Sequence, residues 1–306
     1  MSNSVFNNRV FGCAIVKAIN SNYNADFTHQ PRTLPDGTAY ATDKAFKYSV
    51  RNYIKSQFSD EKIFYFKTLS DDLQPRNLDE TYESYFGKFP AEKDAALRKA
   101  VLKNLLTCID VRLFGATYAG KTNISIHGTT QLTHGVNRFG ESIIYSEQIM
   151  SPFRTGNDKS ADSQMTSLGT QSKLTEGHYV HHFSINPANI KDSVSKVEGT
   201  PLGSDDIAIL KEAMRRGATY YDSSSKAGTE NELLLWVQLK EGSKAVLPSF
   251  VELVDVNDKR VIDLQKIKDL LGSDSIKNEI ESIEIYYDAT TKVANAPDNA
   301  TLHPLN

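Results

Sequence analysis

The first sixth of the chain contains an apolar run, a polar stretch and an amphipathic segment, in that order. Residues 10–19 (VFGCAIVKAI) are apolar and rich in β-branched side chains, which predicts a strand buried on both faces. Residues 20–37 are polar, and Pro35-Asp36-Gly37 is a turn signal. Residues 42–55 then repeat apolar positions at helical spacing. Long loops without structure are uncommon in compact domains, so the polar stretch indicates a functional segment.

The helix predicted over residues 42–55 has two contrasting faces. Thr42 or Asp43 can cap its first turn, because a short side-chain oxygen accepts from free amide groups there. One face suits packing against a core and carries Phe46, Val50, Tyr53 and Ile54. The opposite face carries four basic side chains at intervals of three, four and four: Lys44, Lys47, Arg51 and Lys55. We call these four the cationic face. It favours a polyanionic partner, and a solvated face without a partner is the alternative.

The rest of the chain mixes helices and strands without strict alternation. Strands are expected at residues 62–68, 129–136, 141–145, 178–185, 232–240, 250–256 and 283–287. Helices are expected at residues 91–109, 204–217 and 263–271, with Ser204 as N-cap and Gly217 as the stop of the second. Residues 151–177 suit an exposed excursion, and the tail after Asp288 is expected to fray. This order predicts an α+β fold with a mainly antiparallel sheet covered on one side. A βαββαβ ferredoxin-like core with large insertions fits it, and RNA-recognition modules use the same core.

Composition places the chain among soluble globular proteins. It has 306 residues, of which 39% are hydrophobic and 24% charged, and a formal net charge of -3. A nucleic-acid surface therefore requires local sorting of charge. Residues 9–57 carry seven basic and three acidic side chains, whereas residues 251–306 carry six and eleven, so copies could stack head to tail. No apolar stretch approaches the roughly 18 residues of a membrane span. Two cysteines without metal-like spacing indicate a reducing compartment, and we expect a cytoplasmic protein without membrane contact.

Three motifs in this order resemble a known family. The first is Asn20-Ser-Asn-Tyr-Asn-Ala-Asp26, followed by Pro31-Arg32, Thr42-Asp43 and Lys47…Arg51-Asn52. The second is Asp110-Val-Arg112-Leu-Phe114-Gly115-Ala116 after a helix, and the third is Gly177-His-Tyr-Val-His181. Together they resemble the CRISPR-associated backbone subunits that coat guide RNA in type I Cascade surveillance complexes, with type I-B nearest and type I-C next. Ala25, Phe27 and the run Gly128-Thr-Thr-Gln131 depart from the family pattern.

The resemblance implies one RNA-recognition-like palm spanning residues 1–306, with a finger-like insertion at 70–103 and a thumb-like hairpin at 142–177. It also implies a non-catalytic subunit for antiviral defence, several copies of which line one guide RNA and support its pairing with target DNA. Other Cascade subunits and a recruited helicase–nuclease would be further partners.

The site residues follow from the same resemblance. The cationic face (Lys44, Lys47, Arg51 and Lys55) would bind guide phosphates, assisted by Arg32, Asn52 and Arg112. Gly115 would let backbone amides come close to the RNA strand. Met150, Phe153 and Met165 of the thumb would wedge bases apart, a step that costs unstacking.

Each of these assignments has a structural alternative. Arg112 could close a helix rather than touch RNA, and Phe114 is expected in the core. Met150, Phe153 and Met165 could instead be satellite packing, since isolated methionines often fill gaps. Five of the seven histidines lie between His127 and His182, but no carboxylate partner or H-E-x-x-H pattern accompanies them. We therefore expect no metal and no cofactor. In a strand, His178 and His182 face one way and His181 the other, and the first two suit RNA contact or packing.

Two other functions compete with the backbone subunit. Relatives in type III complexes cut target RNA with an aspartate in the loop after the first strand, where Asp26 lies here. The surrounding motif resembles the non-cutting branch instead, so we expect Asp26 to brace the loop and the protein to lack nuclease activity. A lone RNA-binding module that forms no filament is the other alternative.

Overall fold

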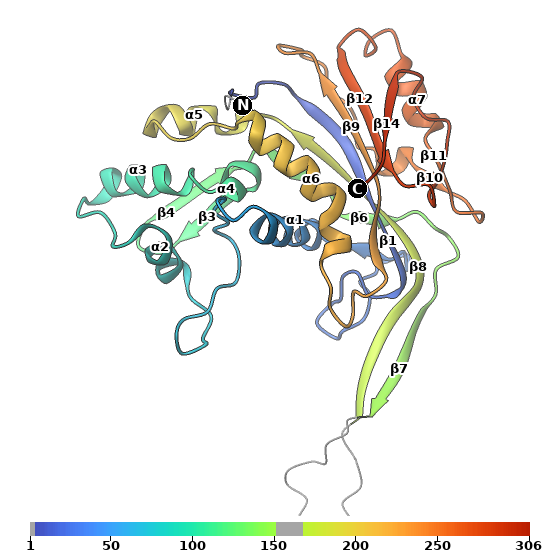
Figure 1. The fold of residues 1–306 in the computed structure, drawn as a ribbon, viewed down its shortest axis with the longest axis horizontal. Coiled ribbons are helices and arrows are strands. Elements are labelled where there is room, and N and C mark those ends of the chain that lie inside the picture. Colours follow the sequence, from blue (N-terminus) through green and yellow to red (C-terminus); the bar gives the residue numbers. More distant parts are fainter. Residues whose placement is uncertain (1–3, 151–167) are drawn as a thin grey trace, which may run out of the picture.

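A mostly antiparallel sheet forms the centre of the molecule (Figure 1). The computed structural model describes residues 4–150 and 168–306, and within them this sheet has nine strands. Its main path runs β14 (Ala300–His303), β12 (Ile280–Tyr287), β9 (Thr229–Leu239), β1 (Val10–Ser21), β8 (Leu168–Ile185), β6 (Gly135–Asn137) and β2 (Tyr40–Ala41). Strands β5 (Thr130–Leu132) and β7 (Ile144–Met150) also pair with β8. Only β12 and β14 pair in parallel among the described strands of this sheet. The expected α+β class with a mainly antiparallel sheet is confirmed.

Strand β1 is buried on both faces, as its apolar run predicts. Its side chains alternate between two cores because successive residues of a strand point to opposite faces. Ala14 and Val16 join the core under helices α1 (Asp43–Gln57) and α6 (Ser204–Tyr220). Cys13 and Ile15 join a second core under α7 (Gln265–Gly272). The sheet is therefore covered on both sides, whereas the sequence led us to expect a single cover.

The second cover is built from the C-terminal region. It contains the 3-10 helix η1 (Val251–Leu253) and a small sheet of β10 (Asp255–Val256), β11 (Val261–Asp263) and β13 (Lys292–Ala294). Two expectations are corrected here. Residues 250–256 are mainly not a strand, and the tail after Asp288 is not frayed, because β13 pairs with β11 and β14 extends the main sheet.

A separate unit of helices and one hairpin lies beside the sheet (Figure 1). Its core contains Tyr82, Leu97, Val101 and Tyr118. The unit comprises α2 (Leu78–Phe86), α3 (Asp94–Leu105), α4 (Ile109–Phe114), α5 (Ala188–Val197) and the pair β3 (Gly115–Ala119) with β4 (Asn123–His127). The single helix expected over residues 91–109 is thus α3, which ends before α4 begins.

Two further expectations differ from the structure. Residues 62–68 do not form a strand, because the amides of Phe64 and Tyr65 donate to the Asp110 carboxylate instead of a ladder. Helix α6 continues past Gly217 to Tyr220 and has Gly203 as its N-cap. Gly217 serves close packing instead: a Cβ there would lie 2.8 Å from the Ser49 carbonyl oxygen of α1. None of the helices in residues 4–150 and 168–306 has the length and apolar character that crossing a bilayer requires.

Candidate nucleic-acid interface

Helix α1 is rigidly anchored, as its apolar face predicts. Phe46, Val50, Tyr53 and Ile54 are all buried. The Thr42 hydroxyl caps the helix by accepting from the amide of Ala45 at 3.3 Å. The preceding loop is tied to this cap because Oδ1 of Asn24 accepts from the Thr42 amide at 2.9 Å and from its hydroxyl at 3.0 Å. Loop and helix therefore present their outer surfaces in a set orientation.

The cationic face exists, but its four members differ in environment. Lys44 and Lys55 are exposed, and the Lys55 ammonium lies 4.5 Å from the centre of the Phe66 ring. Lys47 pairs with Asp43 at 3.0 Å, and Arg51 pairs with Asp110 at 3.1 Å. The net positive charge of this face is therefore lower than the spacing alone predicts.

Arg51 keeps part of its binding capacity. Its Nε donates to Asp110, whereas Nη1 and Nη2 have no hydrogen-bond partner within the described residues. Both Lys47 and Arg51 also lie over the ring of Phe114, at 5.6 and 4.9 Å from its centre. Phe114 packs against the main core, as expected, and its ring makes cation–π contacts with both side chains.

The polar loop is ordered by its own side chains. Nδ2 of Asn22 donates to the carbonyl oxygens of His29 and Ser172, both at 3.2 Å, which links the loop to β8. Oδ1 of Asp26 accepts from the amide and hydroxyl of Thr28, each at 2.8 Å, and from the amide of Gln30 at 3.0 Å. The bond from the Thr28 hydroxyl is the main cause that lowers the pKa of Asp26. The expectation that Asp26 braces the loop is confirmed.

Asn52 belongs to α1 and Arg32 to the loop before it, and both are half-buried. Nε of Arg32 donates to the Ala25 carbonyl oxygen at 3.0 Å, and its guanidinium lies 5.9 Å from the centre of the Phe27 ring. Phe27 is 97% exposed, so its aromatic ring lies in solvent beside an arginine.

Arg112 does not face solvent, which corrects the expected RNA contact. Its side chain is buried, with Nε and Nη2 donating to the two carboxylate oxygens of Asp206 at 2.9 and 2.6 Å. Nη1 donates to the Leu106 carbonyl oxygen at 2.9 Å. Arg112 therefore joins α4 to the first turn of α6, a structural role that differs from the helix-closing one considered from the sequence.

Gly115 and His178 are corrected in the same way. Gly115 is buried with φ +86, and a Cβ there would lie 2.4 Å from the Ile126 carbonyl oxygen. Glycine is needed for this turn from α4 into β3 rather than for approach to a ligand. His178 is buried between two carboxylates: Nδ1 lies 2.6 Å from Glu232 and Nε2 lies 3.2 Å from Glu176.

The neighbouring histidines follow the predicted alternation. His181 stacks on Phe46 of α1, whereas His182 contacts Phe11 and Phe250 on the other face. Burial lowers the pKa of each to about 4. Within the part of the chain that the structure describes, no group of three potential ligands is arranged to hold a metal ion.

The β7–β8 hairpin extends away from the body of the molecule (Figure 1). Met150 ends β7 with 64% of its surface exposed. Phe153 and Met165, the other two expected wedge residues, lie outside the described residues.

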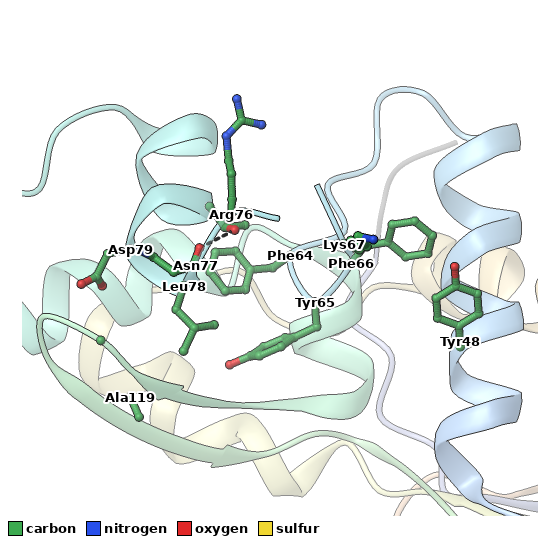
Figure 2. Close-up of a pocket in the computed structure, with 12 residues that line it drawn as sticks. Tyr48, Phe64, Tyr65, Phe66, Lys67, Arg76, Asn77, Leu78, Asp79 and Ala119 are labelled. Carbon is green, nitrogen blue, oxygen red and sulfur yellow. Dashed lines mark hydrogen bonds between the residues drawn. The ribbon is translucent and has the colours of Figure 1, made fainter. Parts of the chain in front are cut away.

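Sequence reasoning missed an aromatic element on the outer surface of α1. Tyr48 is exposed and its ring stacks on Phe66 at 5.1 Å and 18°. The two rings border a cleft of about 640 Å³ that also contains Lys67 and Arg76 (Figure 2). One signal was available: Tyr48 lies four residues after Lys44 and three before Arg51, and therefore on the same helix face.

Comparison with known proteins identifies the family. Residues 8–281 match the family described as CRISPR-associated protein Cas7. No curated protein matches the chain. A chain of a solved structure titled "CRISPR RNA-guided surveillance complex, pre-nicking" is 12% identical, with a TM-score of 0.56 over 97% of this chain and 96% of that one. A chain of a "CRISPR RNA-guided surveillance complex" is 13% identical, with a TM-score of 0.52 over 94% and 95%. The two structures show a shared fold, and because the family match spans most of the sequence, the protein belongs to the CRISPR-associated protein Cas7 family.

Proposed function

We propose that this protein is a non-catalytic subunit that binds CRISPR guide RNA and forms, with further copies, the backbone of a type I Cascade complex. The observation that carries the proposal is the outer surface of α1, where Lys44, Tyr48 and Lys55 are exposed on a helix whose other face is buried. The titles of the two similar structures, which name RNA-guided surveillance complexes, support it. Within type I, the loop motif favours the I-B branch.

The sheet topology supports a ferredoxin-like, RNA-recognition-like palm. The strands β9, β1, β8 and β6 lie side by side and antiparallel, with α1 after β1 and α6 after β8 on the same face. This is the strand order of a βαββαβ core. We assign residues 70–103 to a finger-like insertion and residues 142–177 to a thumb-like hairpin, in which Met150 is the described candidate for a wedge.

Phosphate charge and shape must supply most of the affinity, because the spacer part of a guide varies in sequence. Lys44 and Lys55 are placed to bind phosphates, and the free Nη atoms of Arg51 can add a third contact. Arg32 and Asn52 lie beside them and can assist. Arg112 and His178 are left out of this set because both are buried in pairs with carboxylates.

Stepwise assembly on RNA is the direct test. We expect sedimentation of the purified protein with single-stranded RNAs of increasing length to show mass that grows in equal steps. This assembly would hold the guide for pairing with target DNA and present a surface to other Cascade subunits and the helicase–nuclease. One copy per RNA at every length would instead establish the lone RNA-binding module.

The nuclease alternative has its own test. The hydrogen bonds that Asp26 accepts from Thr28 and Gln30 support a bracing role. We expect complementary RNA to stay intact when it is incubated with the assembled protein and Mg²⁺. Regular cleavage that is abolished in Asp26→Asn, which retains an acceptor oxygen for the loop, would establish the enzyme instead.

A further inference from the structure

The cleft beside α1 is formed by three segments of the chain that are distant in sequence. Tyr48 of α1 lies on one side, and residues 76–81 at the beginning of α2 lie on the other (Figure 2). Residues 64–67 run between them, and the end of β3 at Ala119 and Gly120 completes the lining. Its volume of about 640 Å³ falls within the range of small-ligand sites.

The walls of the cleft are aromatic. Tyr48 and Phe66 form a stacked pair, and Tyr48 is 38% exposed. Figure 2 shows the rings of Phe64 and Tyr65 between this pair and Leu78. The rings of Phe64 and Tyr65 meet edge to face at 5.2 Å. Flat rings in this arrangement offer stacking surfaces to another flat ring.

Two cationic residues, Lys67 and Arg76, line the cleft. Lys67 is exposed and Arg76 is half-buried, and neither side chain has a hydrogen bond or ion pair to any residue that the structure describes. The acidic residue in the lining, Asp79, is already engaged: its Oδ1 accepts from the Tyr118 hydroxyl and from the Lys121 amide, the latter at 2.9 Å. An anion entering here would meet two free cations, with the one lining carboxylate already hydrogen-bonded.

We propose that this cleft binds one unpaired nucleotide of single-stranded RNA. The base lies against the rings of Tyr48, Tyr65 and Phe66, and its phosphate lies between Lys67 and Arg76. Every base has a π-face, so such a site accepts any nucleotide and suits an RNA of variable sequence. The assignment rests on the proposed RNA-binding function, because the cleft opens beside the same α1 surface that carries Lys44 and Lys55.

Photo-cross-linking tests the assignment on the full chain. The probe is a short single-stranded RNA with 4-thiouridine at successive positions, and cross-linked peptides are mapped by mass spectrometry. We expect cross-links within residues 64–67 or 76–81. Cross-links confined to other segments, in a protein that binds the RNA, would overturn the cleft and leave the proposed function standing. A protein that binds no RNA at low salt would overturn both.

Charge removal gives an independent readout. We expect Lys67→Ala with Arg76→Ala to weaken RNA binding about tenfold and to reduce the slope of log K against log salt by about 0.7 for each lost phosphate contact. The matched control is Lys240→Ala with Lys244→Ala, two exposed lysines after β9, for which we expect no change. Equal affinities in the two variants would overturn the cleft assignment. If only Lys44→Glu with Lys55→Glu then lowered the RNA affinity, RNA would bind along α1 and not in the cleft.

Discussion

Nε of Arg51 donates to Oδ2 of Asp110 at 3.1 Å, and this bond connects the cationic face to α4 of the helical unit. Asp110 is fully buried and also accepts from the amides of Phe64 at 2.8 Å and Tyr65 at 2.9 Å. One carboxylate therefore holds α1, residues 64–65 and α4 together. The same bond reduces the charge that Arg51 offers to a polyanion while orienting its remaining donors.

Removing this carboxylate is expected to destabilise the fold. Asp110→Ala leaves the buried amide of Phe64, the partly buried amide of Tyr65 and one guanidinium without their acceptor, which should lower the free energy of unfolding by about 3–5 kcal/mol. Urea denaturation measures the loss. Asp60→Ala, which removes an exposed carboxylate without a hydrogen-bond partner in the described residues, should change stability by less than about 0.5 kcal/mol. Equal stabilities of the two variants would contradict the role of Asp110.

Charge reversal on α1 should weaken RNA binding. Lys44→Glu with Lys55→Glu removes the two exposed cations, so we expect lower affinity and a salt slope that falls by about 0.7 for each lost contact. Titration with fluorescent single-stranded RNA at several salt concentrations measures both. Lys47→Ala should have a smaller effect because Lys47 is already paired with Asp43. Unchanged affinity in the double variant would count against the proposed function.

Arg112 is expected to act on stability rather than on RNA. Arg112→Met leaves the buried Asp206 carboxylate without its cation, and we expect a loss of about 3–5 kcal/mol. The double variant Arg112→Met with Asp206→Leu should recover much of that loss, because no buried charge remains. Urea unfolding of the four proteins in this cycle gives the coupling. A folded Arg112→Met protein of normal stability that binds RNA poorly would restore the role expected from the motif.

Buried histidines predict a loss of stability in acid. Burial lowers the pKa of His181 from 6.5 to about 4, so the unfolded chain takes up its proton first as the pH falls. The stability that neutral His181 contributes is fully present above pH 6.5 and is lost progressively as the pH falls toward 4. The slope of the unfolding free energy against pH approaches about 1.4 kcal/mol per pH unit in that interval. Unfolding free energies measured across that interval should fall less steeply in His181→Gln. A slope identical to that of the unmodified protein would exclude His181 as a cause.

Helix packing at Gly217 can be tested with a matched glycine. A Cβ at Gly217 would lie 2.8 Å from the Ser49 carbonyl oxygen, so Gly217→Ala should separate α1 from α6 and cost about 1–3 kcal/mol. Gly272 ends α7, and a Cβ there would meet no described atom within 4 Å, so Gly272→Ala should be neutral or slightly stabilising. Thermal unfolding of both variants decides whether the α1–α6 contact requires glycine.

Local patterns in the chain predicted the elements that lead to the candidate site. The apolar run at residues 10–19 became β1, and the spacing of Phe46, Val50 and Ile54 correctly gave α1. Of the two candidate caps, Thr42 is the one that the structure uses. The expected strand at residues 62–68 failed because its amides bind a side chain 45 and 46 residues away. The apolar and aromatic composition of that segment predicts a strand, and it gives no indication that a remote carboxylate accepts from its amides.

The order of apolar and polar residues by itself was enough to place β1, α1 and the four cations of one helix face, because helix and strand periods follow from backbone geometry. Lys47 pairs with Asp43 within the same helix, but the other counter-charges were decided by the tertiary structure. Arg51 meets Asp110 59 residues away, Arg112 meets Asp206 94 residues away, and His178 meets Glu232 54 residues away. Such pairs form when folding brings remote segments together, and burying a charge then requires a counter-charge at that point in space. Residue spacing determines the face on which a side chain lies, whereas the packing of the whole chain determines what it meets there.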